Sequence, residues 1–228
     1  MEFGVFENRI GHGFRDKRLL ETAFTHRSYL NENRTAGREH NERLEFLGDA
    51  VLELAVTEFL FSKYPDKPEG DLTAYRAALV NTQSISEAAG KLGMNEFLLL
   101  SRGESRDVGR ARQIILANAF EALIGALYLD QGYGAAKDFI GKQLFHKTDD
   151  VVARRLWQDA KSRFQELVQE KTGVTPSYQL IQQSGPDHEK QFVIGAYIGT
   201  EKVAQGEGRS KQEAEQAAAE KALIAKGW

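Results

Sequence analysis

The residues best suited to chemistry lie in the segment 41–52, which reads NERLEFLGDAVL. Glu42, Glu45 and Asp49 are spaced at i, i+3 and i+7, so a helix would place all three on one face. Residues 44–61 contain four acidic residues and no Lys or Arg, so no basic side chain within this stretch can neutralise them. Because clustered carboxylates repel one another and hard divalent ions such as Mg²⁺ take oxygen ligands, the spacing favours a metal site.

A second segment, residues 114–127, is apolar on every side and therefore predicts a buried helix. Its only charged residue is Glu121, and Asn118 lies one turn earlier on the same side. An unpaired buried carboxylate is costly, so Glu121 is expected to take up a proton or to find a partner. If the two helices pack together, four side chains can surround one cation: Glu45, Asp49, Asn118 and Glu121.

The helical wheel of the first segment predicts which face is buried. The predicted core stripe contains Leu44, Leu47, Val51 and Leu54. The three acids lie roughly opposite this stripe, and Phe46 and Leu52 are expected near the acidic face. An aromatic side chain beside carboxylates on an outer face indicates that a second surface covers it, most simply another subunit.

The elements that must position these residues fall into two regions. Residues 1 to about 145 have helical spacing without strand-like alternation, and breakers separate the segments at 11–13, 65–70, 90–93 and 132–134. After a more polar stretch the order changes to a helix at 160–172 and strands at 177–183, 191–198 and 201–207. Ser210 and Glu213 then form a capping box that opens a last helix, and Gly227 ends it.

The predicted fold is therefore an all-α domain followed by a small α+β domain with the order α-β-β-β-α. The predicted boundaries are 1–146 for the first domain, 147–158 for a linker and 159–228 for the second domain.

Bulk properties narrow the function classes. The chain has 228 residues, a net charge of −3 and no cysteine, which excludes disulfides and thiolate metal sites. Neither a signal peptide nor an apolar stretch long enough for a bilayer is evident, so a soluble cytoplasmic protein is expected. Residues 159–228 carry 9 basic and 10 acidic residues, so contact with a polyanion would depend on local clusters.

Residues 41–52 resemble the signature of ribonuclease III, the double-stranded RNA endonuclease. Residues 25–29, 68–72 and 117–130 also resemble that family in the same order, so the resemblance covers essentially the whole chain. It implies a homodimer that cleaves double-stranded RNA, such as rRNA precursors and other RNA duplexes, and leaves 5′-phosphate and 3′-hydroxyl ends. It also implies Mg²⁺ as the cofactor, with Mn²⁺ as a substitute, and neither an organic cofactor nor a membrane partner.

The resemblance assigns roles to individual residues. Glu45, Asp49 and Glu121 would be metal ligands, and Asp49 and Glu121 would act at the hydrolytic centre. Glu42 and Glu69 match further acids of the family's catalytic valley. Phe46 matches the aromatic residue that plugs into the partner subunit.

One position departs from the family pattern. Asn118 stands where the family usually has an aspartate ligand. An amide oxygen can still coordinate Mg²⁺ but carries no charge, so metal affinity should fall. This departure raises an alternative from another class, a catalytically weakened or silent double-stranded RNA-binding protein.

The last 70 residues resemble the double-stranded RNA-binding domain. The helix that begins near Ser210 is flanked by Arg209 and Lys211, and the dipole and free N–H groups of a helix N-terminus attract phosphate. The resemblance adds the loop containing His188 and Lys190, and Gln165 and Glu166 on the first helix. Such domains read the shape of A-form duplexes more than their sequence. Because Gln212 stands where the family often has a second lysine, modest and strongly salt-dependent binding is expected.

Each of these residues also has an ordinary structural interpretation. Three acids on a helix face are commonly a solvated surface, and Glu69 before a helix fits the macrodipole preference for acids. Asn118 can be a polar core residue, His26 is more easily explained as structural than as an acid-base group, and the basic residues beside Ser210 can be solvated charges. Glu121 resists this interpretation best, because its helix offers no exposed face.

Overall fold

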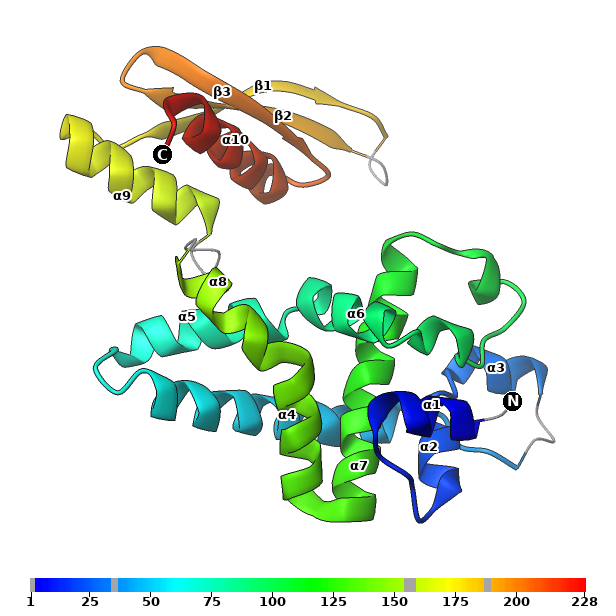
Figure 1. Cartoon of the computed structure of the whole chain (residues 1–228). Helices are drawn as coiled ribbons and strands as arrows, with labels where there is room; N and C mark the ends of the chain where they lie inside the picture. The colour runs from blue at the N-terminus through cyan, green and yellow to red at the C-terminus, as the bar shows by residue number, and fades with distance from the viewer. Residues whose placement is uncertain (1–2, 34–36, 154–158, 187–189) are drawn as a thin grey trace. The chain divides into compact units, whose positions relative to one another are not determined.

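The computed structural model describes residues 3–33, 37–153, 159–186 and 190–228 (Figure 1). The chain forms two compact units, Met1–Trp157 and Gln158–Trp228, and each is described by itself.

The regular elements described in unit 1 are helices, as predicted. Its α-helices are α1 (Phe3–Ile10), α2 (Lys17–Ala23), α3 (Arg27–Glu32), α4 (Glu42–Lys63), α5 (Glu69–Val80), α6 (Thr82–Lys91), α7 (Arg110–Leu144) and α8 (Thr148–Ala153). Short 3₁₀ helices lie at η1 (Met94–Glu96), η2 (Glu104–Arg106) and η3 (Phe145–Lys147). The β-pairing described in this unit is an isolated bridge between Thr25 and Leu99.

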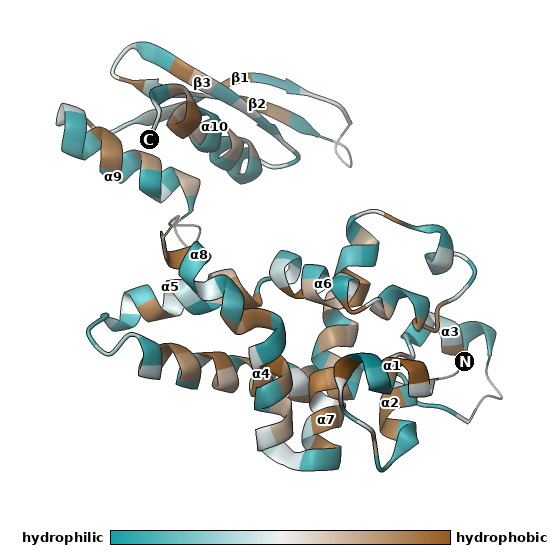
Figure 2. Cartoon of the chain, viewed as in Figure 1, coloured by the Kyte–Doolittle hydropathy of each residue, from teal (hydrophilic) through white to brown (hydrophobic). Residues whose placement is uncertain are grey.

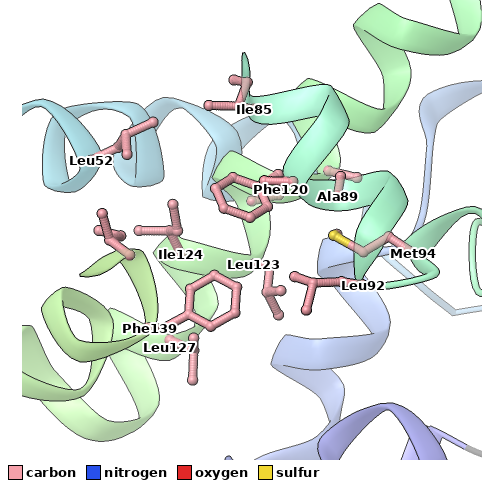
Figure 3. Packing of buried hydrophobic residues seen from close by; sticks show 14 of the residues in the cluster. Leu52, Ile85, Ala89, Leu92, Met94, Phe120, Leu123, Ile124, Leu127 and Phe139 are labelled. Carbon is pink, nitrogen blue, oxygen red and sulfur yellow. The ribbon is translucent and has the colours of Figure 1, made fainter. Parts of the chain in front are cut away.

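Helix α7 forms the centre of unit 1. Its buried side chains, among them Phe120, Leu123 and Ile124, pack against Leu52 of α4 and Ile85 of α6 (Figure 3). Hydrophobic residues recur along both α4 and α7 (Figure 2). By length and composition the helical stretch Arg110–Ala153 could cross a membrane, but 56% of its most apolar window is buried inside the structure, as expected for a core helix.

The predicted break at 132–134 lies inside α7. Gly132 has a φ of 83°, outside the helical region, so it kinks the helix between two helical parts. This backbone conformation is accessible to glycine and strained for other residues.

Two glycines set how closely α4 and α7 approach. A Cβ atom on Gly48 would lie 1.7 Å from the carbonyl oxygen of Glu121, and one on Gly125 would lie 2.3 Å from the carbonyl oxygen of Leu44. Since no side-chain atom fits there, the two backbones are in direct contact. This contact explains why glycine is present at both positions, although glycine inside a helix costs about 1 kcal/mol relative to alanine.

The buried face of α4 differs from the predicted stripe at two positions. Leu54 is 56% exposed, whereas Leu52, which was predicted near the acidic face, is fully buried. The prediction rested on the helical spacing of apolar residues within α4 alone. Because Gly48 lies in the contact with α7, the buried face is rotated toward Leu52 and Val56 and away from Leu54.

Unit 2 has the predicted α-β-β-β-α order. Helix α9 (Ala160–Thr172) precedes the strands β1 (Ser177–Ser184), β2 (Gln191–Ile198) and β3 (Glu201–Gly208), and α10 (Lys211–Lys226) follows. The strands pair antiparallel in the order β1-β2-β3. Side chains of α9 and α10, including Phe164, Val168 and Leu223, form the core with Ala196 of β2.

The predicted caps of α10 are confirmed. The Ser210 hydroxyl accepts a hydrogen bond from the Glu213 N–H at 3.1 Å, and the Arg209 N–H donates to the Glu213 carboxylate at 3.0 Å. Gly227 ends the helix with a φ of 71°. Gly206 lets β3 lie close to α10, since a Cβ at this position would meet the backbone nitrogen of Ala218 at 2.1 Å.

The domain boundaries of 1–146 and 159–228 remain a prediction. The predicted linker 147–158 contains α8, and residues 154–158 lie outside the described part of the chain.

The glycine contact between α4 and α7 generates the first prediction. Gly125→Ala should lower the free energy of unfolding by about 2 kcal/mol, because overpacking against backbone atoms typically costs about 1–3 kcal/mol. Urea unfolding followed by circular dichroism measures this change.

Gly134→Ala is the matched control, since Gly134 also lies in α7 but has nothing within 4 Å of a Cβ. That substitution should be neutral or stabilising by about 0.5–1 kcal/mol. Equal effects at the two glycines would contradict the close approach at Gly125.

Candidate active site

The contact between α4 and α7 brings the two acidic segments together. Gly48 of α4 lies against the backbone of Glu121, so Glu45 and Asp49, on either side of Gly48 in the sequence, face the same turn of α7. Asn118, one turn before Glu121, is hydrogen-bonded to the Glu45 side chain. The structure therefore brings together the four residues predicted as metal ligands.

The ionised form of the Glu121 carboxyl is disfavoured in this position. Burial raises the pKa of its carboxyl from the ordinary 4.5 to about 8, and the nearby carboxylates of Asp49, Glu45 and Glu53 add to the shift. The sequence-based expectation of a proton or a partner for Glu121 is consistent with this environment. A perturbed carboxyl beside other acids is a common feature of functional sites.

Glu45 is partly buried and is affected in the same direction. Burial raises the pKa of its carboxyl, and the charges of Glu42 and Asp49 raise it further. The hydrogen bond from Asn118 acts in the opposite direction, because it stabilises the ionised carboxylate. Asn118 therefore offsets part of the cost of holding Glu45 charged.

The chemistry of this donor set fits a hard divalent cation. Three carboxylates and one amide supply oxygen ligands, and no ion pair with a basic side chain is described for Glu45, Asp49 or Glu121. As the side chains stand, no three His, Cys, Asp or Glu residues of the described chain are close enough to hold a metal ion. The assignment of these four residues as ligands stays a prediction.

One ion pair beside this cluster was not predicted from the sequence. Glu53, one turn after Asp49, accepts a contact from Arg76 Nε at 2.7 Å, and the Arg76 guanidinium also donates to Thr57 Oγ1 at 2.9 Å. Glu53 was visible as the next acid in the basic-free stretch. Its partner was not, because Arg76 comes from α5 and approaches only when the helices pack.

The two acids predicted for the outer valley have different surroundings. Glu42 is an exposed acid at the start of α4, with Arg27 at 3.4 Å and His40 at 3.7 Å. Glu69 is the first residue of α5 and accepts a hydrogen bond from Thr73 at 2.9 Å. Glu42 influences Glu45, whereas the interactions described for Glu69 do not reach the four clustered residues.

His26 has a structural role. Its ring nitrogen Nδ1 accepts from the Ser28 N–H at 3.3 Å and so caps the N-terminus of α3. Burial lowers the pKa of His26, which favours the neutral ring that this cap requires. The structural interpretation of His26 is therefore the one that its contacts support.

A third side of α4 exposes apolar residues. We call Phe46, Ala50, Leu54 and Phe61 the exposed stripe; Phe46 is 82% and Phe61 73% exposed. Phe46 borders a hollow of about 570 Å³ that is also lined by Leu19, Leu47 and Leu129. By the helical period, the acids lie between the exposed stripe and the buried face of α4.

In unit 2, the N-terminus of α10 carries the predicted basic residues. Arg209, Ser210 and Lys211 are all exposed. Because Phe192 pairs with Gly208, Lys190, which directly precedes β2, lies at the same end of the sheet. His188 falls outside the described residues.

The other predicted contact strip lies on α9, where Gln165 and Glu166 are exposed. Helix α9 is attached to the first turns of α10 by hydrogen bonds from Gln216 to Asp159 at 2.9 Å and from Lys161 to Glu215 at 2.7 Å. The predicted RNA-contacting residues on the two helices therefore belong to one compact unit.

Two protein families match the chain. Residues 16–148 match the family described as Ribonuclease-III-like, and residues 160–225 match the double-stranded RNA binding motif.

Similar proteins match over nearly the whole chain. Ribonuclease 3 of Pelotomaculum thermopropionicum is 48% identical over 220 residues, which are 96% of this chain and 91% of that protein. Ribonuclease 3 of Geobacillus kaustophilus is 47% identical over 97% of this chain and 90% of its own length. A solved nuclease domain of ribonuclease III from Campylobacter jejuni has a TM-score of 0.56 and 41% identity, covering 62% of this chain and 98% of that domain.

The environment of Glu121 generates a prediction about pH. The Glu121 carboxyl has a pKa of about 8 in the folded protein and an ordinary pKa of 4.5 in the unfolded chain. As the pH rises between these two values, the unfolded chain loses its proton first, so the free energy of unfolding falls. In EDTA, the difference in free energy of unfolding between Glu121→Gln and the unsubstituted protein should therefore shift in favour of the variant by more than about 1 kcal/mol from pH 5 to pH 8. Urea unfolding at the two pH values measures this.

The matched control is Asp66→Asn, which changes an exposed acid in the connection between α4 and α5. Its effect should be the same at pH 5 and pH 8. A Glu121→Gln effect equally independent of pH would show that the Glu121 carboxyl does not titrate in this window.

Proposed function

This chain belongs to the ribonuclease III family of double-stranded RNA endonucleases, and we propose that it hydrolyses phosphodiester bonds with Mg²⁺ bound between α4 and α7. The family depends on divalent metal ions; the choice of Mg²⁺, with Mn²⁺ as a substitute, is part of the proposal. The observation that supports it best is the partly buried Glu121, whose pKa is raised to about 8 by burial and by three nearby carboxylates.

We propose four ligands for the metal, Glu45, Asp49, Asn118 and Glu121. When bound, the ion would supply a water activated for attack and would stabilise the leaving oxygen. Asp49 is exposed and can face the RNA backbone, whereas Glu121 is partly buried behind it. Glu42 and Glu69 are proposed as outer acids of the same valley.

The alternative of a silent RNA-binding protein is not supported. The similar proteins are named as nucleases, and the first unit matches a nuclease family over residues 16–148. Asn118 also keeps an oxygen that can coordinate a cation, so the departure at this position reduces charge without removing the ligand atom.

Unit 2 binds double-stranded RNA. For its contacts we propose Gln165, Glu166, His188, Lys190, Arg209, Ser210 and Lys211. The capped N-terminus of α10, with Arg209 and Lys211 beside it, is suited to phosphate. Since residues 159–228 are net −1 (9 basic and 10 acidic), we expect the affinity to fall steeply with salt.

We propose that the enzyme is a homodimer formed through the exposed stripe of α4. Large apolar side chains such as Phe46 and Phe61 are exposed there, at 82% and 73%, and contiguous exposed apolar surface commonly marks an interaction site. The nuclease domain of ribonuclease III from Campylobacter jejuni has a region involved in dimer formation. The hollow beside Phe46 is suited to an aromatic ring of the second copy.

The cellular setting is also a proposal. A nuclease of this kind without a membrane partner or organic cofactor would act in the cytoplasm on rRNA precursors and other structured RNAs. Its products would carry 5′-phosphate and 3′-hydroxyl ends.

Cleavage of a labelled RNA duplex with and without Mg²⁺ tests the proposed activity. Cleavage should require the metal, and Glu121→Gln should reduce it by at least about 100-fold while duplex binding stays nearly unchanged. Gel electrophoresis of the products and filter binding give the two readouts.

Lys211→Ala is the complementary variant. It should weaken duplex binding and reduce the slope of log K against log salt concentration by about one. Metal-dependent hydrolysis should remain measurable at saturating RNA. Retention of the duplex without cleavage at any Mg²⁺ concentration would exclude the proposed enzyme.

The exposed stripe generates a separate prediction. Phe46→Ala should weaken the dimer by at least about tenfold, because a buried phenyl ring at an interface contributes more than about 1.4 kcal/mol. Sedimentation equilibrium measures the dissociation constant. Val108→Ala, at a 90% exposed apolar residue outside the stripe, should leave it unchanged. An unaltered dimer in Phe46→Ala would rule out this interface.

A further inference from the structure

We propose that Asp130 and Asn41 are positioning residues for the dimer, because they hold the two ends of α2 and so fix one wall of the hollow beside Phe46. The proposal rests on the proposed dimer interface. In a two-fold symmetric dimer both copies use the same surface, so a side chain and a hollow that adjoin on one copy can each meet their counterpart on the other. The Phe46 ring is 82% exposed and borders the hollow, so the occupant is the Phe46 ring of a second copy.

Side chains from three helices line the hollow. Leu19 and Thr22 line it from α2, Leu129 from α7 and Leu47 from α4. The direct backbone contact at Gly48 fixes the separation of α4 from α7. Helix α2 has only seven residues, and a helix this short is not stable by itself. The position of the α2 wall therefore depends on the contacts that hold this helix.

The half-buried Asp130 carboxylate holds the start of α2. Its Oδ2 accepts a hydrogen bond from the Arg15 N–H and its Oδ1 accepts one from the Asp16 N–H, each at 2.9 Å. Asp16 is the N-cap residue of α2, so both bonds act where the helix begins. Hydrogen bonds to an ionised carboxylate are roughly twice as strong as those between neutral groups. Because Asp130 directly follows Leu129 in α7, it ties the α2 wall to the α7 wall.

The side chain of Asn41 holds the other end of α2. Asn41 directly precedes α4 and is 2% exposed, but its side chain does not cap that helix. Its Nδ2 instead donates to the carbonyl oxygen of Ala23, the last residue of α2, at 3.2 Å. Its backbone N–H donates to the carbonyl oxygen of Thr25 at 2.9 Å. Asn41 therefore ties the α2 wall to the start of α4.

These contacts set the position of the wall, whereas other residues keep α2 in the core. Leu20 and Ala23 are fully buried, so α2 stays attached to unit 1 when either contact is lost. Leu19 lies in the first turn of α2, near the end that Asp130 holds. Loss of Asp130 therefore loosens the side of the hollow that Leu19 lines. A looser wall has to be ordered again when the ring of the second copy enters, and this ordering lowers the affinity.

Sedimentation equilibrium of Asp130→Ala tests the proposal. The dissociation constant of the dimer should rise about tenfold, the size expected when hydrogen bonds to a charged group are lost. Asn41→Ala should weaken the dimer in the same direction. In the Phe46→Ala background, Asp130→Ala should change the dissociation constant by less than about twofold, because its effect acts through the ring in the hollow.

Glu32→Ala is the matched control. The Glu32 carboxylate also accepts a hydrogen bond from a backbone N–H, that of Arg102 at 3.2 Å, but Glu32 lies on α3 and does not line the hollow. This substitution should leave the dissociation constant unchanged. Equal weakening by Asp130→Ala with and without the Phe46 ring would overturn the positioning role, and so would no weakening at all.

A milder variant serves if Asp130→Ala does not fold. Asp130→Asn keeps the shape of the side chain and one acceptor oxygen, so it should lose one of the two hydrogen bonds. It should weaken the dimer by about threefold, and this effect should again vanish in the Phe46→Ala background. An effect of equal size in both backgrounds would again contradict the proposal.

Hydrogen–deuterium exchange separates the positioning role from the proposed interface. In monomeric Phe46→Ala, adding Asp130→Ala should speed exchange of the backbone amides of residues 15 and 16 by at least about tenfold, and adding Glu32→Ala should not. Unchanged exchange would show that Asp130 does not hold α2 and would overturn the proposal. If exchange accelerates but Phe46→Ala dimerises as tightly as the unsubstituted protein, the proposed interface fails. The role of Asp130 in the dimer then fails with it, while its hold on α2 stands.

Discussion

The direct contact between the backbones of α4 and α7 is the constraint on which the rest of the site depends. Gly48 and Gly125 leave no room for a side chain between the helices, so the carbonyl of Glu121 lies against Gly48 and the carbonyl of Leu44 against Gly125. A wider crossing would move the acids of α4 away from α7. The close contact therefore converts two separate acidic segments into one cluster, and the tight core around Leu52 and Phe120 maintains it.

This packing has an electrostatic consequence. Apolar burial raises the pKa of Glu121, and the carboxylates around it increase the cost of charging it. Arg76 lies at one end of the acidic row, on Glu53, and Arg27 lies at the other end, on Glu42. Positive charge is thus supplied at both ends, while the centre keeps an amide and acids. Such an arrangement stabilises the helix packing and leaves the negative charge at the centre able to attract a cation.

Much of this organisation could be predicted from the sequence. The order of elements, the helix at Ala160–Thr172, the strand at Gln191–Ile198 and the caps at Ser210 and Gly227 follow from local chemistry, and the structure confirms them. The clustering of Glu45 with Glu121 was predicted because a charged residue in an apolar helix is costly to bury without a partner. The predicted buried face of α4 was wrong at Leu52 and Leu54, and the Glu53–Arg76 ion pair was not predicted. Both depend on how helices cross, which periodicity within one helix does not encode.

The position of the acids beside the exposed stripe links two equilibria. Covering the stripe with a second copy would remove water from one side of the acidic row and strengthen electrostatic attraction to any cation there. Mass action then makes each event favour the other, so divalent ions would tighten the assembly and dilution would loosen the hold on the ion. Dimerisation would then depend on the metal concentration, and metal binding would depend on the protein concentration.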